Sequence, residues 1–169
     1  MTKIQYENLT IRQTVPADAK QLAAWWNDGA VMAHAGFPNG LGITEEEVIR
    51  GLGGGSLVIE ENDRLIGECN YRQTEDGVAE IGIKICETDC QNRGAGRKLL
   101  SMLVGWLFQN GYSKIILDTN VKNTRAQHVY ESLGFSKVRT NVDAWKDQLG
   151  QPQSSIDYEL TPADFNSCL

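Results

Sequence analysis

The chain has 169 residues, of which 41% are hydrophobic and 22% are charged, and its formal net charge is −6. This length allows one domain over residues 1–169 with a sizeable core, and the acidic balance disfavours a nucleic-acid-binding protein. No segment has the apolar length of a signal peptide or a membrane span, so a cytoplasmic protein with no membrane partner is expected.

The first half of the chain is predicted to form a strand, two helices and a three-stranded meander. Pro16 lies at the start of the first helix, since proline is tolerated in a first helical turn. Thr44 and Glu47 form a capping box for a short helix that ends in the glycine run at residues 53–55. The expected elements are a strand at 7–14, a helix at 17–28, a loop at 30–42, a helix from 44, and strands at 56–61, 65–71 and 78–86.

The second half alternates helices and strands. Apolar residues recur with helical spacing after residue 98 at Leu99, Leu100, Leu103, Val104, Leu107 and Phe108. The further elements are a strand at 113–121, a helix from Asn123 to Gly134, and strands at 135–142 and 154–160 around a turn at 147–153. A helix between strands 78–86 and 113–121 makes that pair parallel in an otherwise antiparallel sheet. The prediction is an α+β fold, a mixed and mostly antiparallel sheet flanked by about four helices.

The stretch QNRGAGR, residues 91–97, places two glycines at the start of a helix. A helix N-terminus presents unpaired N–H groups and a partial positive charge, and glycines there let an anion reach the backbone. Arg93 and Arg97 add charge-assisted contacts. The stretch lacks the third glycine of a dinucleotide fingerprint and the GK[ST] ending of a P-loop. The alternative is that the glycines only shape a tight strand-to-helix turn.

Two blocks of this sequence resemble the GNAT superfamily of N-acetyltransferases. Gln91-Asn92-Arg93-Gly94-Ala95-Gly96 resembles its Q-x-x-G-x-G acetyl-CoA pyrophosphate loop. NTRAQHVYESLGF, residues 123–135, resembles its N-x-x-A-x-x-x-Y-E-x-x-G-F block. The close match runs over about residues 78–135. The layout is most similar to the branch of ribosomal-protein N-terminal acetyltransferases and their small-molecule relatives.

The resemblance implies a cofactor site where strands 78–86 and 113–121 splay apart. Acetyl-CoA is the expected cosubstrate, with its pantetheine arm along the backbone of Ile83 and Ile85. The expected pyrophosphate contacts are Gln91, Asn92, Arg93, Gly94, Ala95, Gly96 and Arg97. Asn123 is expected to contact the CoA arm, and its alternative role is a helix N-cap. The four cysteines form no CxxC pair and no metal site is expected.

Four residues are candidates for the chemistry, one tyrosine for the leaving thiolate and three acids for the base. Tyr130 matches the tyrosine that in many members hydrogen-bonds or protonates the departing CoA thiolate, and its alternative is a core position. Asp118 is the first candidate for the base, Glu80 the second and Glu68 a distant third. The alternative for each acid is a solvated strand position.

The function expected is acetyl-CoA-dependent transfer of an acetyl group to a primary amine by direct attack in a ternary complex. A protein N-terminus and a small-molecule amine both stay open as acceptors. His34 and one of Trp25 and Trp26 are candidates for the acceptor side of the site. A non-catalytic CoA-binding module and a structural domain are the rival functions. A homodimer is a further expectation, because dimers are frequent in the superfamily.

Overall fold

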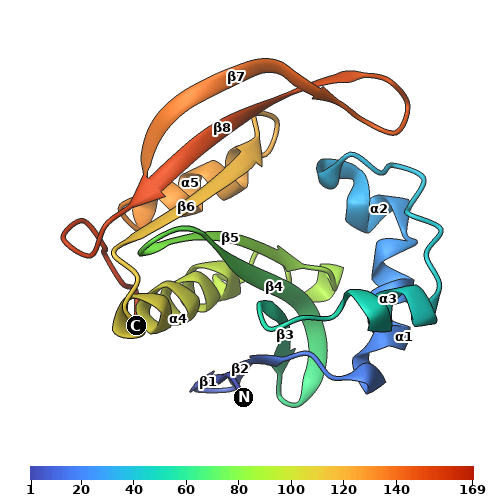
Figure 1. The fold of residues 1–169 in the computed structure, drawn as a ribbon, viewed down its shortest axis with the longest axis horizontal. Helices are drawn as coiled ribbons and strands as arrows, with labels where there is room; N and C mark the ends of the chain where they lie inside the picture. Colours follow the sequence, from blue (N-terminus) through green and yellow to red (C-terminus); the bar gives the residue numbers. More distant parts are fainter.

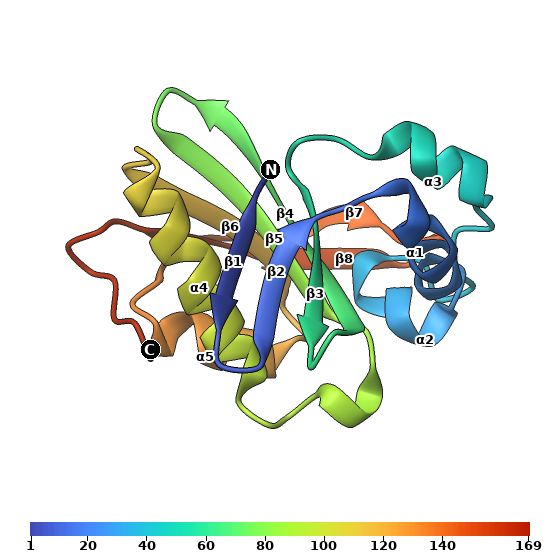
Figure 2. The same ribbon diagram turned by 90° about the horizontal axis from the view of Figure 1, so that it is seen from below.

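A computed structural model describes all residues, 1–169, and contains one eight-stranded sheet with five α-helices. The strand order is β1-β2-β3-β4-β5-β6-β8-β7. Figure 1 shows α4 and α5 on one side of the molecule and α1, α2 and α3 on the other, and Figure 2 shows the strands between these two helical groups. The predicted α+β fold is therefore confirmed, with five α-helices where about four were expected.

The first two strands of the chain form a hairpin. The expected strand at 7–14 corresponds to β2 (Leu9–Gln13), and β1 (Lys3–Tyr6), which was not predicted, precedes it and pairs with it antiparallel. Glu7 has a φ of 53°, a left-handed conformation that reverses the chain between them. No element was predicted for residues 1–6, because a two-residue turn made without glycine gives no local signal of a hairpin.

The helices that follow form the first helical group. Pro16–Asp18 is a 3₁₀ turn, followed by α1 (Ala19–Trp26), α2 (Gly29–Met32) and α3 (Glu45–Gly51). Part of the expected loop at 30–42 is therefore helical. The predicted capping box is present, because Thr44 accepts a hydrogen bond from the Glu47 amide and Glu47 accepts one from the Thr44 amide. The helix ends two residues before the glycine run that was expected to end it.

The meander and the second helical group agree with the sequence pattern. The meander consists of β3 (Ser56–Glu61), β4 (Arg64–Glu75) and β5 (Val78–Ile85). The elements after it are α4 (Ala95–Gln109), β6 (Lys114–Asn120), α5 (Thr124–Ser132), β7 (Ser136–Lys146) and β8 (Pro152–Leu160). The predicted stripe of α4 faces the main core, where Leu99, Leu103, Val104 and Leu107 are fully buried.

A smaller core holds the first helical group on the sheet. Leu22 and Trp25 of α1 pack with Val48 of α3, Val58 of β3 and Cys86 after β5. Burying such side chains contributes roughly 1.5–3 kcal/mol each to stability, so α1 is fixed beside the end of β5. This placement brings α1 and α2 against the region where β5 and β6 separate.

Candidate active site

The parallel pair of strands separates after three residues. β5 and β6 are paired at Val78–Lys114, Ala79–Ile115 and Glu80–Ile116, and not beyond. A cleft of about 1080 Å³ opens where they part. Its walls come from α1, α2, the free parts of β5 and β6, the start of α4, α5 and the β7–β8 hairpin. The predicted splay is therefore present.

The open edge of β5 carries main-chain groups without a ladder partner. The Cys86 amide donates to Ile66 O across β4, so by strand alternation the main-chain groups of Ile81, Ile83 and Ile85 point toward the gap. Ile85 O accepts a hydrogen bond of 2.8 Å from Gln91 Nε2. Ile83 keeps both main-chain groups available for an extended ligand.

Residues 91–97, the glycine loop, present free amides at the start of α4. Gly94 is the N-cap with a φ of 80°, and no side chain caps the helix. No group of the protein accepts a hydrogen bond from the amides of residues 92–97. A Cβ added at Gly94 meets nothing within 4 Å, and one at Gly96 meets only Ile85 Cδ1 at 3.9 Å. Open space over unpaired amides is the arrangement that binds an anion, and it fits a diphosphate.

Two of the three arginines near this loop face the cleft. Arg97 and Arg125 are among its lining residues. Arg125, in the first turn of α5, donates to Asn92 Oδ1 and so joins α5 to the glycine loop. Arg93 instead lies 2.8 Å from Glu61 and does not line the cleft. Arg125 was not anticipated from the sequence, although its position two residues after Asn123 was a usable signal.

Tyr130 of α5 is 8% exposed and packs edge-on against Phe135 and at a tilt against Tyr158, with ring centroids 5.8 and 5.7 Å away. Its hydroxyl makes no hydrogen bond within the protein, and no side-chain polar atom is both buried and unpaired, so the hydroxyl reaches the cleft surface. Burial and the charge of Asp118 raise the pKa of Tyr130 to about 12. The phenol therefore stays protonated and acts as a hydrogen-bond donor toward the cleft.

Asn123 has the helix-capping role that was the alternative to a contact with the CoA arm. Its side chain accepts a hydrogen bond of 3.2 Å from the Ala126 amide as the N-cap of α5. The residue also lines the cleft. The cap fixes the first turn of α5, which carries Arg125.

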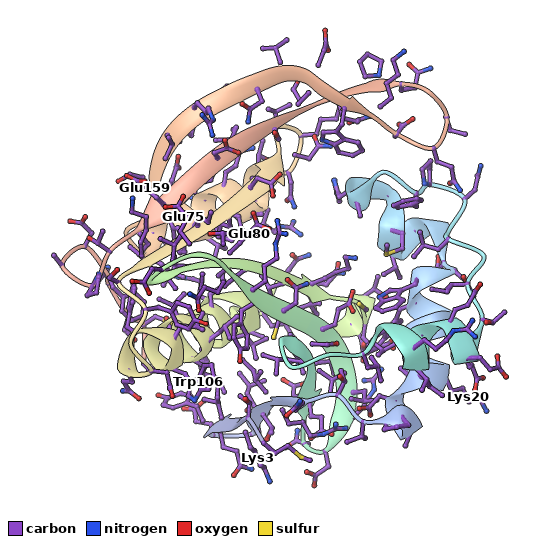
Figure 3. The ribbon with its side chains drawn as sticks, viewed as in Figure 1. Lys3, Lys20, Glu75, Glu80, Trp106 and Glu159 are labelled. Atoms are coloured by element: carbon purple, nitrogen blue, oxygen red, sulfur yellow. The ribbon has the colours of Figure 1, made fainter.

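The acidic candidates have different surroundings. Asp118 lines the cleft and pairs with no cation, and its direct neighbour across β6 and β8 is Asp157. The side chain of Asp118 is exposed to the cleft, and desolvation by the cleft walls together with the charges of Glu80 and Asp157 raises its pKa above the ordinary value. Glu80 forms an ion pair of 2.8 Å with Arg72 and does not line the cleft. Figure 3 shows Glu80 and Glu159 at the end of the sheet where β5 and β6 are still paired.

Glu68 is engaged by two groups. It accepts a hydrogen bond of 2.8 Å from Trp26 Nε1 and lies 3.6 Å from Lys84 Nζ. These contacts account for its position without a role as a base. Asp118 and Asp28 both line the cleft without a cation partner, but Asp28 accepts a hydrogen bond from the Ala30 amide as the N-cap of α2.

The remaining wall of the cleft comes from α1, α2 and the β7–β8 hairpin. Trp25 is buried in the smaller core, also lines the cleft, and donates a hydrogen bond of 3.0 Å to Glu87. His34 lines the cleft from the segment after α2. Trp145 of β7 lines it from the hairpin, and it was not anticipated, because nothing in its local sequence distinguishes it from any aromatic residue of an edge strand.

The predicted site residues therefore fall into two groups. Those that line the cleft are Ile83, Ile85, Gln91, Asn92, Gly94, Gly96, Arg97, Asp118, Asn123 and Tyr130. Those that do not are Glu80, Arg93 and Ala95. The side chain of Ala95 is buried, which leaves its amide as the group offered to a ligand.

None of the helices combines the length and the apolar composition that a membrane-spanning helix needs.

A mixed sheet that splays at its one parallel pair, with free amides at the next helix, defines a cofactor-binding acyltransferase fold. The acetyltransferase (GNAT) domain model matches residues 8–136, and the chain belongs to this family. A mycothiol acetyltransferase of Cellulomonas flavigena is 29% identical over 108 residues, 58% of this chain and 31% of that protein. The chain spans less than a third of the length of the curated relatives that it matches.

Solved structures share the whole fold. A spermidine N-acetyltransferase from Vibrio cholerae, in complex with CoA and spermine, has a TM-score of 0.81 at 21% identity, covering 93% of this chain and 97% of that one. A ribosomal-protein-alanine N-acetyltransferase from Brucella melitensis has a TM-score of 0.76 at 20% identity, covering 89% and 98%. Proteins named for a small-molecule and for a protein acceptor thus share this architecture.

Proposed function

We propose that the protein is an acetyl-CoA-dependent N-acetyltransferase that acts on a primary amine. The observation that carries the proposal is the set of unpaired amides at residues 92–97, open to the cleft above Gly94 and Gly96. A diphosphate on these amides is held by hydrogen bonds and by the positive end of α4. Arg97 and Arg125 add charge to the same place.

The gap between β5 and β6 directs the thioester. The free main-chain groups of Ile83 pair with an amide-bearing arm as a neighbouring strand does, which aligns the arm along β5. The thioester supplies the acetyl group. The thioester end of the arm would then reach the part of the cleft that Tyr130 and Asp118 line.

The transfer forms one bond and breaks one bond. The amine nitrogen attacks the thioester carbon, a C–N bond forms, the C–S bond breaks, and the sulfur leaves with the electron pair. Tyr130 donates a hydrogen bond to that sulfur. With its pKa at about 12, full proton transfer to a thiolate of pKa near 8.5 is uphill by roughly 5 kcal/mol. The thiolate therefore leaves hydrogen-bonded and takes its proton from solvent.

The amine must be neutral when it attacks, and its nitrogen loses a proton when the amide forms. An α-amino group of pKa near 8 costs about 1.4 kcal/mol to deprotonate at pH 7, whereas a lysine near 10.4 costs about 4.6 kcal/mol. Asp118 is the acceptor of this proton, directly or through one water, because its carboxylate faces the cleft without a cation partner. Glu80 is less suited, because Arg72 neutralises it.

The test is thiol release from acetyl-CoA, measured with peptides of different first residues, polyamines and aminoglycosides. Calorimetric titration with CoA separates binding from turnover, with Gly96→Trp as the variant that fills the open space. We expect the native protein to bind CoA and to release thiol with at least one amine class. CoA binding without release for any amine leaves a non-catalytic CoA-binding module, and absence of binding eliminates both functions.

A further inference from the structure

The β7–β8 hairpin is bent toward α2 by an irregularity in its pairing. Asn141 pairs with Ser155 and Trp145 pairs with Gln153, so four steps along β7 oppose two along β8. Asp143 lies in the extra segment with a φ of 48°, and its amide donates 2.9 Å to Ser154 Oγ. Such a bulge increases the local twist and bends the strand. Figure 1 shows the hairpin arching from the sheet toward α2.

The tip of this hairpin, residues 145–151, is fastened to the segment after α2 through Gln148. The Gln148 amide donates to Gly36 O at 2.8 Å. Its side chain accepts from the Asn39 amide at 2.9 Å and donates to Gly40 O at 2.9 Å. The tip is internally braced as well, because the Asp147 carboxylate accepts from three donors within residues 149–153. Two loops distant in sequence therefore behave as one wall.

Trp145 is the part of this wall that faces the cleft. Its ring lies against the backbone of Gly36, where an added Cβ would lie 2.3 Å from the ring atom Cζ3. Gly36 has a φ of 96°, so glycine is required there both by conformation and by the approach of the indole. The ring is half-buried and lines the cleft beside the segment that carries His34.

We infer that Trp145 determines which acceptors enter the cleft, with Gln148 as the positioning residue that holds it in place. This inference rests on the proposed function. The glycine loop, β5 and α5 are assigned to the acetyl donor, so an acceptor approaches between α1–α2 and the hairpin. Trp145, fixed against Gly36, limits the breadth of that passage. The wall admits a slender aliphatic amine and excludes bulky ring amines. Further ammonium groups of a slender polyamine can lie against the face of the indole ring.

The experiment compares two acceptors, spermidine as the slender amine and kanamycin as the bulky one, in the full-length protein. Trp145→Ala is expected to raise the ratio of kcat/KM for kanamycin over spermidine about tenfold or more, the discrimination that a pocket wall typically provides. Trp145→Phe is expected to give a smaller rise. The KM for acetyl-CoA is expected to stay within about twofold, since the ring packs against Gly36 in the segment after α2.

Gln148 is tested with a readout that does not depend on turnover. In Gln148→Ala the Asn39 amide loses its acceptor, so its hydrogen exchange is expected to accelerate, and the acceptor ratio is expected to shift in the same direction as in Trp145→Ala. Leu149→Ala, at an exposed neighbouring position of the tip, is the matched control and is expected to change neither. Melting temperatures of all four variants exclude loss of the fold as the cause.

The outcomes separate the inference from the function beneath it. Native protein that transfers acetyl groups, combined with an unchanged acceptor ratio in Trp145→Ala and Gln148→Ala, overturns the role of the hairpin alone. Native protein that neither binds CoA nor releases thiol overturns the proposed function and this inference together. A raised ratio in Trp145→Ala with an unchanged KM for acetyl-CoA supports both.

Discussion

Arg93, in the glycine loop, forms an ion pair of 2.8 Å with Glu61 at the end of β3. Arg93 was predicted to contact the diphosphate, but its guanidinium group is already paired with a carboxylate. Arg93→Ala is expected to change the KM for acetyl-CoA by less than about threefold. Arg97→Ala and Arg125→Ala each remove a cleft-facing charge and are expected to raise it about tenfold, the effect of one charge-assisted hydrogen bond.

Glu61→Gln is the complementary variant in this series. It releases Arg93 toward the cleft, so CoA is expected to bind at least as tightly as in the native protein. Steady-state kinetics measure the KM for acetyl-CoA, and calorimetric titration measures the affinity for CoA. A larger rise of the KM for acetyl-CoA in Arg93→Ala than in Arg97→Ala contradicts the assignment of Arg97, and not Arg93, to the diphosphate.

Two glycines of α4 provide a matched test of the open space above the helix start. Cβ atoms added at Gly96 and Gly105 each meet a single atom at 3.9 Å, in Ile85 and Phe165 respectively, so alanine fits at both. Alanine is about 1 kcal/mol more favourable than glycine in a helix, so both variants are expected to be as stable as the native protein or more stable. Only Gly96→Ala is expected to weaken CoA binding. Equal affinities in the two variants would mean that the ligand does not approach Gly96.

Tyr130→Phe keeps the packing against Phe135 and Tyr158 and removes one hydroxyl that makes no internal hydrogen bond. The melting temperature is therefore expected to stay nearly constant, while kcat falls about a hundredfold, the typical effect of losing a positioned donor. Tyr158→Phe is the control, because its hydroxyl donates to Glu131 rather than to the cleft. It is expected to reduce stability by about 1 kcal/mol and leave kcat unchanged.

The pH dependence of the native rate tests the same residue. Because the pKa of Tyr130 is raised to about 12, its deprotonation is not expected to lower kcat between pH 8 and 10. A fall in kcat in that window that disappears in Tyr130→Phe contradicts a protonated donor.

Asp118→Asn is expected to make the protein more stable and less active. The folded-state pKa of Asp118 is raised by desolvation and by the charges of Glu80 and Asp157, so folding favours the protonated form. The ionised carboxylate therefore destabilises the fold above the folded-state pKa, and this cost is absent below the ordinary value of 3.8. The gain in melting temperature is expected at pH 7 and not at pH 3. Asp157→Asn, which loses an ion pair with Arg139, is the contrasting variant.

Asp18 stabilises the start of the first helical group. It is 4% exposed, receives two hydrogen bonds of 2.9 Å from Arg12, and accepts the Val15 amide at 2.8 Å. Asp18→Ala leaves Arg12 with Glu60 as its one carboxylate partner and is expected to lower the free energy of unfolding by roughly 3 kcal/mol. Glu7→Gln, at an exposed pair with Lys98, is expected to cost under about 1 kcal/mol. Urea unfolding measures both.

The same carboxylate has the opposite pH dependence to Asp118. Burial alone would raise the pKa of Asp18, but the hydrogen bonds from Arg12 and Val15 outweigh it and lower the pKa below 3.8. Its contribution is therefore present above pH 3.8 and is lost as the pH falls through the folded-state value. The difference in stability between the native protein and Asp18→Ala is expected to shrink below pH 3.8.

Local signals accounted for much of the fold. The capping box at Thr44, the apolar stripe of α4 and the helix between two strands each depend on residues close together in the chain, and each prediction is confirmed. β1, the first strand of the β1–β2 hairpin, and α2 were missed because their local signals are weak. A turn through a positive φ at Glu7 and a four-residue helix both depend on tertiary packing that outweighs local preference.

By itself, the sequence determined where free main-chain amides lie, because a glycine pair at a helix start presents them wherever that helix lies. The tertiary structure decided which charges face that place. Glu61 of β3 holds Arg93, Arg72 of β4 holds Glu80, and Trp145 reaches the cleft through a bulge far along the chain. Ion pairs and walls between distant segments depend on strand register and bending, which no local residue spacing encodes.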